Sequence, residues 1–204
     1  MAKKPAKKKQ ALTPIYDPKK PVYIIGGGAS LVDFNFNKLL GRQVLALNTA
    51  HRKMKNAAAM LFSDKQFYQQ WGDTNQKDDF WRFKGQIYTT LVELKDHPRI
   101  KHVKLGEGNT GVKSILLAKA LGAETVILLG FDGKAGHWHE NTRLAHRGTT
   151  AKTAYARYIK EFEGLAKTKH GLTIINANED SAITCFETMA LSEALQLTIN
   201  QGDL

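Results

Sequence analysis

Residues 110–132 read TGVKSILLAKALGAETVILLGFD, and this stretch decides the fold class. Its first half places apolar residues at helical spacing, at positions 112, 115, 116, 118, 120 and 121. Gly122 then provides a C-terminal cap, and an apolar run from Val126 to Asp132 follows after three residues. A helix joined by a short turn to a buried strand predicts a unit of a parallel α/β sheet.

Similar alternation extends from this unit in both directions along the chain. Strands are predicted at 22–26, 43–48, 57–64, 86–90, 102–105 and 172–178, and further helices at 65–71, from Thr149 or Thr150 to about 169, and at 186–195. Buried strands that alternate with helices favour a doubly wound arrangement. The predicted fold is α/β, a single Rossmann-like, mostly parallel sheet with helices on both faces.

Length and composition predict one folded domain behind a basic tail. The 204 residues suffice for one α/β core, and 42% hydrophobic with 24% charged residues is ordinary for a folded protein. Residues 1–20 hold seven lysines against Asp17, a net +6 of the formal +11. We expect a disordered tail over 1–20 and the domain over 21–204. The tail either attracts polyanions such as DNA or only keeps the chain soluble.

Cysteine content and hydropathy indicate where the protein works. Cys185 is the single cysteine, so no disulfide can form within the chain and a reducing compartment is expected. No apolar run approaches the length of a membrane span, and no apolar segment follows the N-terminal lysines as in a signal peptide. The sequence predicts a cytoplasmic protein without a membrane partner.

A glycine-rich turn, GGGAS at 26–30, directly follows the first predicted strand. Glycines let the backbone approach a phosphate closely, and free N–H groups with the Ser30 hydroxyl can donate to it. The turn lacks the GK[ST] ending of a P-loop and the third glycine of GxGxxG. We predict nucleotide binding by Gly26, Gly27, Gly28 and Ser30; a tight turn without a ligand is the alternative.

A second glycine-rich turn, GEGNTG at 106–111, opens the helix of the deciding stretch. The positive end of the helix dipole makes Asn109, Thr110 and Gly111 candidates for the phosphate side of the ligand. An N-cap by Asn109 or Thr110 without any ligand is the competing interpretation.

Polar residues at predicted strand ends complete the candidate nucleotide site. Asn48, Ser63, Asp64 and Asp132 stand where parallel sheets place their ligands, and they could bond a sugar hydroxyl or a base edge. Asn and Asp also begin loops for purely local reasons, so the same residues have a structural interpretation.

Histidines are the candidate acid–base groups. His137, His139 and His146 follow the strand that ends at Asp132, and an imidazole suits proton abstraction from an acceptor hydroxyl near neutral pH. The alternatives are a metal site built from His137, His139 and Asp132, or surface histidines without a role. We predict proton transfer and no metal.

Four short blocks resemble one protein family. GGGAS, the strand ending ALN48, GNTGVKSILLAKALGAETVILLGFD132 with its histidine loop, and IINANEDSAITCFE187 are similar to the sialyltransferase-like fold of glycosyltransferase family 42. The pattern also resembles the domain of archaeal 6-hydroxymethylpterin diphosphokinases and of small bacteriophage proteins. The similarity spans about residues 22–195.

The resemblance implies a metal-independent transferase that holds a nucleotide, cytidine monophosphate in the sialyltransferases. It implies nucleotide contacts at the two glycine turns and at Asn48, with His146, or next His139, as the catalytic base. The sialyltransferases carry tyrosines after the strand-end aspartate that steady the departing phosphate. Residues 133–136 here are Gly-Lys-Ala-Gly, so Lys134 or Arg143 would have to substitute for them electrostatically.

Three functions follow from these interpretations. The leading one is a nucleotide-sugar-dependent glycosyltransferase that needs no cofactor. It would be encoded by a phage, work in the cytoplasm of the host and act on DNA or a modified base. The second is an ATP-dependent, Mg²⁺-requiring diphosphokinase that uses Asp64 and Asp132. The third is a non-catalytic nucleic-acid-binding protein that stacks bases on Trp71, Trp81, Phe80 and Phe83. The sequence leaves open whether the chain forms a homo-oligomer.

Overall fold

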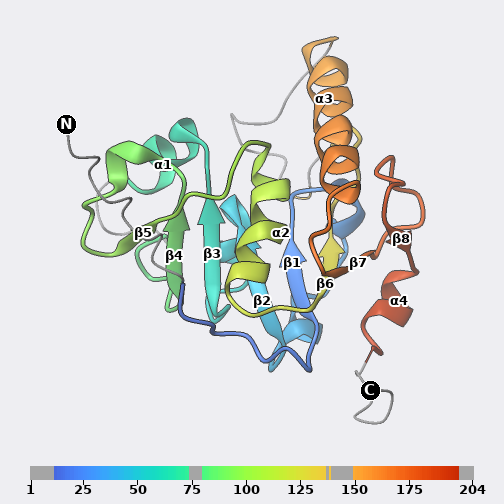
Figure 1. Cartoon of the computed structure of the whole chain (residues 1–204), viewed down its shortest axis with the longest axis horizontal. Coiled ribbons are helices and arrows are strands. Elements are labelled where there is room, and N and C mark those ends of the chain that lie inside the picture. The colour runs from blue at the N-terminus through green and yellow to red at the C-terminus, as the bar shows by residue number, and fades with distance from the viewer. Residues whose placement is uncertain (1–11, 74–79, 137, 139–148, 198–204) are drawn as a thin grey trace, which may run out of the picture.

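A single eight-stranded sheet organises the chain in the computed structural model, which describes residues 12–73, 80–136, 138 and 149–197 (Figure 1). Every strand pairing is parallel, and the order is β5-β4-β3-β2-β1-β6-β7-β8. The strands are β1 (Val22–Ile25), β2 (Gln43–Leu47), β3 (Ala59–Phe62), β4 (Gln86–Thr89), β5 (Ile100–His102), β6 (Thr125–Leu129), β7 (Thr173–Asn176) and β8 (Glu187–Thr188). The predicted α/β fold class is confirmed.

Helices connect these strands and cover both faces. They are α1 (Lys65–Trp71), α2 (Thr110–Ala120), α3 (Thr149–Ala166) and α4 (Leu191–Ala194), with shorter 3₁₀ turns η1 (Ala29–Leu31), η2 (Phe36–Leu39), η3 (Asn48–Arg52) and η4 (Val92–Leu94). None of the helices within the described ranges is long and apolar enough to cross a membrane.

Two sequence-based element predictions were wrong in part. The single helix expected over 186–195 is instead strand β8 followed by α4, because Glu187 and Thr188 pair with Ile175 and Asn176 at the sheet edge. Strand β5 begins at Ile100, two residues before the predicted strand, since the buried Ile100 pairs with Ile87. Both errors lie near the two ends of the sheet, where short strands carry little periodic signal.

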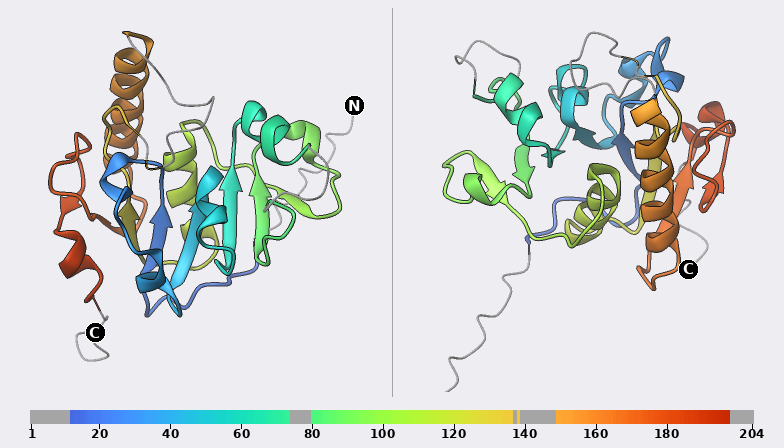
Figure 2. Two further views of the ribbon diagram at one scale, coloured as in Figure 1. Left: turned by 180° about the vertical axis from the view of Figure 1, so that it is seen from behind. Right: turned by 90° about the horizontal axis from the view of Figure 1, so that it is seen from above.

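Alternating strand residues supply two separate cores, one on each face. One core packs under α2 and α3 and contains Val22, Ile24, Leu45, Leu61, Val126 and Leu128. The other packs under α1, α4 and the 3₁₀ turns and contains Tyr23, Ile25, Val44, Ala46, Met60, Phe62, Ile127 and Leu129. The views from behind and from above show the helices on the two sides of the sheet (Figure 2). Burial on both faces explains why the strands read as continuous apolar runs.

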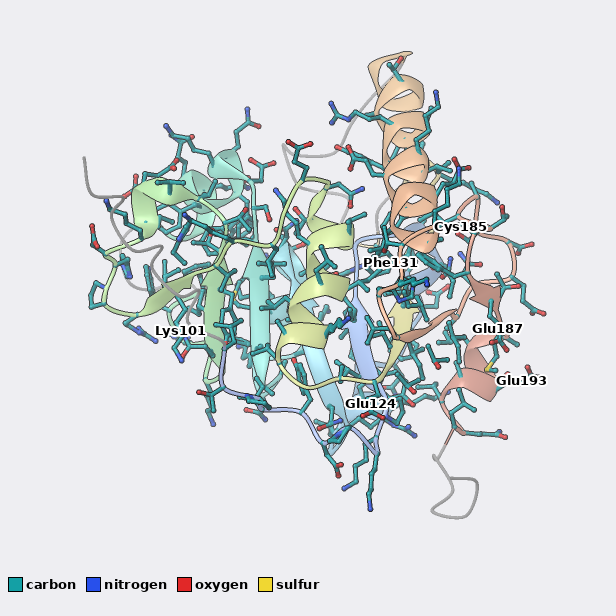
Figure 3. The ribbon with its side chains drawn as sticks, viewed as in Figure 1. Lys101, Glu124, Phe131, Cys185, Glu187 and Glu193 are labelled. Carbon is teal, nitrogen blue, oxygen red and sulfur yellow. The ribbon has the colours of Figure 1, made fainter. Side chains whose placement is uncertain are left out.

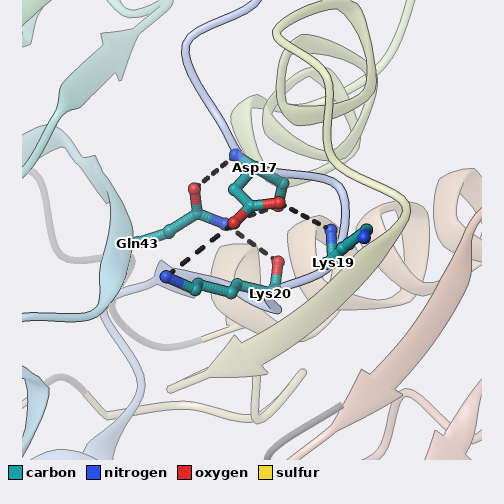
Figure 4. A network of polar contacts seen from close by, with 4 residues as sticks. All are labelled: Asp17, Lys19, Lys20 and Gln43. Atoms are coloured by element: carbon teal, nitrogen blue, oxygen red, sulfur yellow. Dashed lines mark hydrogen bonds and ion pairs between the residues drawn. The ribbon is translucent and has the colours of Figure 1, made fainter. Parts of the chain in front are cut away.

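The chain already packs on the domain before residue 21. Tyr16 is 4% exposed and donates its hydroxyl to the Val44 carbonyl, while the amides of Ile15 and Tyr16 donate to the Leu121 carbonyl. The Gln43 side chain accepts from the Asp17 amide and donates to two nearby carbonyls (Figure 4). Residues 12–20 therefore brace the N-terminal end of β2 and the C-terminal end of α2.

The strand order reverses between β1 and β6. Chain direction moves from β1 through β2 to β5 on one side, and from β6 through β7 to β8 on the other. Connections leave the sheet on opposite faces at such a point, which opens a crevice beyond the carboxyl ends of the two strands. The glycine turn after β1 and Asp132 after β6 both lie at this reversal.

Candidate functional site

A cavity of about 260 Å³ opens at this reversal of strand order. Most of its lining comes from four segments, which are the turn after β1, the start of η3 after β2, the start of α2 and the turn after β6; Asp64 after β3 and Ile183 also contribute. Helix α3 forms a further wall. The structure brings together around this cavity most of the residues that the sequence nominated for a nucleotide: Gly26, Gly27, Gly28, Asn48, Asp64, Asn109, Thr110, Gly111 and Asp132.

Asp132 fastens the glycine turn to the end of β6. Its Oδ1 accepts hydrogen bonds from the Ser30 hydroxyl at 2.6 Å and from Asn178 Nδ2 at 2.9 Å. Its Oδ2 accepts from the Ser30 amide at 2.9 Å. Both carboxylate oxygens are thus engaged, and the Ser30 hydroxyl points to Asp132 rather than toward an open donor position. This pair holds the turn in shape.

Positions 26 and 28 require glycine because neighbouring groups pack directly against their backbone. A Cβ at Gly28 would lie 2.4 Å from the Asp132 carboxyl carbon, and one at Gly26 would lie 2.7 Å from the Gly130 carbonyl oxygen. Trp138 also bonds to the turn, through its indole N–H to the Gly26 carbonyl at 2.9 Å. The turn is a close-packed junction whose remaining surface faces the cavity.

The second glycine turn forms the N-terminus of α2. Asn109 caps the helix by accepting from the Val112 amide at 3.1 Å, and its own amide donates to Glu161 Oε2 of α3 at 2.6 Å. The buried Asn109 Nδ2 has no hydrogen-bond partner among the described residues. Asn109 is therefore the N-cap of α2, and its Nδ2 remains a buried donor on a residue that lines the cavity.

Gly111 lets α2 approach the wall beneath α3. A Cβ there would lie 2.6 Å from the Phe162 ring and 2.9 Å from the Phe131 ring. The two phenylalanine rings meet edge to face with centroids 5.9 Å apart, and Phe131 lies near the base of α3 (Figure 3). Close packing here sets the distance between the α2 N-terminus and the α3 wall.

At the end of β2, Asn48 and Thr49 line the cavity and carry buried polar atoms. Asn48 has a left-handed backbone, with φ +47°, and its buried Oδ1 has no partner within the described chain. Thr49 is 3% exposed, and its hydroxyl likewise lacks a partner there. Sequence reasoning missed Thr49, because a threonine after a strand carries no specific signal.

At the end of β3, the two nominated residues have different roles. Asp64 lines the cavity but is exposed, and its side chain caps α1 by accepting from the Gln66 amide at 2.7 Å. Ser63 does not line the cavity, although its buried hydroxyl lacks a partner among the described residues.

Residues of α3 and the β6 turn complete the wall, and the sequence did not nominate most of them. Tyr155, Tyr158 and Phe162 line the cavity from α3, and the exposed Lys134 lines it from the β6 turn. Burial, with lesser contributions from Tyr158 and Asp132, raises the pKa of Tyr155, so its phenol stays protonated at neutral pH. Tyr155, Tyr158 and Phe162 follow helical spacing, which is also typical of residues that face a core, so nothing in the sequence assigned them to a site.

The proposed catalytic histidines, His137, His139 and His146, lie outside the described residues, as does Arg143. Trp138, between the first two in sequence, is described and bonded to the glycine turn. Within the described ranges, no three His, Cys, Asp or Glu side chains gather as a metal site would require.

The aromatic residues considered for base stacking are largely committed to the fold. Phe80 and Phe83 are 0% and 3% exposed and surround the buried His51 edge-on. The half-buried Trp81 stacks on His97 and carries the Arg99 guanidinium over its ring, and Arg52 lies over Trp71. These rings hold the η3 and α1 region together, which weakens the basis for a stacking surface.

Comparison with known proteins finds similarity among solved structures only. No protein-family model and no curated protein sequence matches the chain. Among solved structures, it is similar to the sialyltransferase CstII from Campylobacter jejuni in complex with a substrate analogue, cytidine-5'-monophosphate. The TM-score is 0.58 at 15% identity over 93% of this chain and 90% of that one. A structure of CST-II with trisaccharide acceptor and CMP gives 0.57 at 16% identity, over 91% and 89%.

A third similar structure is the MAf glycosyltransferase from Magnetospirillum magneticum AMB-1, with a TM-score of 0.54 at 11% identity. The match covers 88% of this chain and 34% of that one. This protein has a glycosyltransferase-like fold. At these identities the likeness concerns the fold alone, and the resemblance to diphosphokinases and phage proteins stays a prediction.

Proposed function

We propose that this protein is a glycosyltransferase that takes its sugar from a nucleotide sugar bound in the cavity between the ends of β1 and β6. The observation that carries the proposal is the meeting of the glycine turn and the start of α2 on one cavity at the reversal of strand order. Either turn alone has a structural explanation. The amides of Gly26, Gly28 and Ser30 donate within the fold, so the donors that we propose for an anion are the amides of Thr110 and Gly111, at the positive end of the α2 dipole.

The phosphate of the ligand would lie between the glycine turn and the start of α2. The helix dipole and the exposed Lys134 both favour negative charge there. Asn48 and Thr49, on the β2 side of the cavity, would bond the sugar or base of the nucleotide through their unpartnered oxygens. Because two similar structures contain CMP, cytidine nucleotides are the first to test.

In the transfer step, the acceptor oxygen attacks the anomeric carbon as the bond from that carbon to the phosphate oxygen breaks. The bonding electrons leave with the phosphate, and the acceptor proton passes to a base, for which we propose His146, or otherwise His139. The protonated Tyr155 phenol and its neighbour Tyr158 would donate to the departing phosphate, as Lys134 would by charge. These residues would replace the tyrosines that residues 133–136 lack.

For the acceptor, we propose a polyanion such as DNA. The supporting observation is in the sequence, where five of the first nine residues are lysine. Binding of the acceptor, and any part that the N-terminal lysines play in it, does not depend on binding of the nucleotide sugar in the cavity, so each has its own experiment.

A ligand screen tests the nucleotide site directly. Melting temperatures are recorded with CMP, UDP, GDP, ADP and ATP, each with and without Mg²⁺. A ligand at one hundred times its Kd adds about 2.7 kcal/mol of stability, which corresponds to a rise of about 5–10 °C for a domain of this size. We expect this rise with CMP in the absence of Mg²⁺. A rise only with ATP and Mg²⁺ would transfer the proposal to the diphosphokinase class.

Histidine variants test the chemistry once a donor has been found. His146→Ala or His139→Ala should lower turnover by about 10²–10⁴-fold while nucleotide affinity and melting temperature stay near those of the parent. Stoichiometric zinc in the purified protein, or chelator-sensitive activity restored by metal, would instead favour the His137–His139 metal site.

A further inference from the structure

The backbone of Asn48 adopts a left-handed conformation, with φ +47°, at the cavity wall. It is the single non-glycine residue with positive φ in the described part of the chain. Asparagine adopts left-handed backbone more readily than most L-residues, but the conformation is uncommon outside glycine and often occurs at functional sites. The conformation turns the chain from β2 into η3 and leaves the Asn48 side chain on the cavity.

His51, three residues further along the chain, contacts the backbone of Asn48. Its ring is fully buried, and Nδ1 lies 2.6 Å from the carbonyl oxygen of Asn48. A carbonyl oxygen only accepts hydrogen bonds, so Nδ1 carries the proton in this contact. The rings of Phe67, Phe80 and Phe83 meet the imidazole edge-on at centroid distances of 5.7–6.4 Å, which fixes its plane.

We propose that His51 is a positioning residue of the ligand site, which holds Asn48 left-handed so that Asn48 and Thr49 present their oxygens to the ligand. The expected effect on ligand binding rests on the proposed nucleotide site. The brace, by which we mean the hydrogen bond from His51 to the Asn48 carbonyl, is present in the free protein. His51 does not line the cavity, so the effect that we propose on the ligand passes through Asn48.

The chemistry of the presented atoms defines what they would recognise. Asn48 Oδ1 accepts hydrogen bonds, and the Thr49 hydroxyl donates or accepts. Both atoms are buried without a partner in the described chain, where an unmet hydrogen bond costs about 1–3 kcal/mol. They suit a ligand edge that carries amino or hydroxyl groups, such as the exocyclic amine of a base or a ribose hydroxyl.

Titration calorimetry of CMP with four proteins tests the coupling: the parent, His51→Phe, Asn48→Gly and the double variant. Phenylalanine keeps a ring in the aromatic cage and removes the donor. We expect His51→Phe to weaken CMP binding about tenfold in the parent and to have no effect once Asn48 is glycine. Equal weakening in both backgrounds would mean a general loss of structure and would overturn the proposal.

Conservative variants separate the two ring nitrogens. Asparagine at 51 places an amide donor near the position of Nδ1, whereas glutamine places one near the position of Nε2. His51→Asn should therefore retain CMP affinity better than His51→Gln, when both are compared at temperatures well below their melting points. The reverse order would assign the role to the other nitrogen and reject the brace.

Nitrogen-15 NMR of the free protein tests the brace without any ligand. A proton on Nδ1 of His51, and a shift of the Asn48 backbone signals away from left-handed values in His51→Phe, are the expected results. A proton confined to Nε2, or unchanged Asn48 signals, would refute the proposal. If the parent binds none of the nucleotides, the proposed function fails while this measurement still decides the role of His51.

Discussion

Single residues at the glycine turn show how tightly the site is built. Gly28 has an ordinary backbone conformation, with φ −64°, so its need for glycine comes from space and not from strain. The space is taken by the Asp132 carboxylate, which three hydrogen bonds hold in place. A side chain that is pinned in this way cannot move aside cheaply.

Replacing Gly28 by alanine should therefore damage both the fold and the site. The new Cβ would lie 2.4 Å from the Asp132 carboxyl carbon, and relieving that overlap should cost about 1–3 kcal/mol of unfolding free energy. We expect a lower melting temperature and no stabilisation by CMP. Denaturant unfolding with and without CMP measures both effects, and a variant that keeps the parent's CMP response would place the nucleotide elsewhere.

Residue chemistry was predicted from sequence where a local rule applies. Glycines directly after a strand predict that another group packs close to the backbone, and Asn109 before an apolar helix predicts an N-cap. No such rule applies to Thr49 and Tyr155 at the cavity or to Trp138 against the glycine turn, because their positions depend on packing between distant elements. The left-handed backbone of Asn48 is equally invisible, since it depends on the aromatic cage that holds His51.

Among the elements, the N-terminus of α2 is expected to combine a structural and a binding role. Asn109→Ser and Asn109→Asp both keep a side chain that can cap the helix, so both variants should unfold near the parent's denaturant midpoint. The aspartate adds a negative charge where we place a phosphate. We expect it to weaken CMP binding by at least about tenfold, or 1.4 kcal/mol, relative to the serine variant.

Calorimetry of the two Asn109 variants measures that difference. Raising the salt concentration should narrow it, because the repulsion between charges is screened. Equal affinities for the serine and aspartate variants at low salt would show that the phosphate does not approach α2.

Helix α3 offers a matched control for the glycine substitution. Gly164 lies near its C-terminal end, and a Cβ there would meet nothing within 4 Å. Glycine inside a helix costs about 0.5–1 kcal/mol relative to alanine, so Gly164→Ala should raise the melting temperature by about 1–4 °C and leave CMP binding unchanged. Destabilisation by this variant would mean that α3 does not form in solution as it does here.

Elements with a strong period were predicted well, and short ones at the edges were not. The apolar spacing of 110–122 corresponds to α2, and the run after it corresponds to β6. Strand β8 has two residues, both exposed, so its pairing with β7 left no hydrophobic pattern to find. Edge pairing of this kind depends on the backbone of the neighbouring strand and not on the side chains that a sequence displays.

At the scale of the whole molecule, the topology explains why residues far apart in sequence meet. Parallel pairing brings every strand's carboxyl end to one edge, and the reversal between β1 and β6 opens that edge for a ligand. The order of strands was not predicted from the sequence. The sequence nevertheless predicted the edge of the sheet at which the cavity lies, because any parallel sheet gathers the carboxyl ends of its strands at one edge.

The last prediction separates the lysine-rich start of the chain from the segment that supports the fold. Removing residues 1–11 takes away five lysines and should leave the melting temperature within about 1 °C of the parent, since the buried Tyr16 stays in place. Removing residues 1–20 also removes Tyr16, whose burial is worth about 2 kcal/mol, together with its bonds to the Leu121 and Val44 carbonyls. That longer deletion should lower the melting temperature clearly.

DNA binding by the shorter deletion decides the role of these lysines. If all five contact phosphates of a duplex, the slope of log K against log salt should be shallower by about 4.5 in the protein without residues 1–11. CMP affinity should be the same in both proteins, because the cavity lies at the carboxyl edge of the sheet and none of its lining residues is removed. Fluorescence anisotropy with a labelled duplex at several salt concentrations measures the slope. Equal slopes for the two proteins would show that these lysines do not bind DNA, and the proposal of a polyanion acceptor would lose its support.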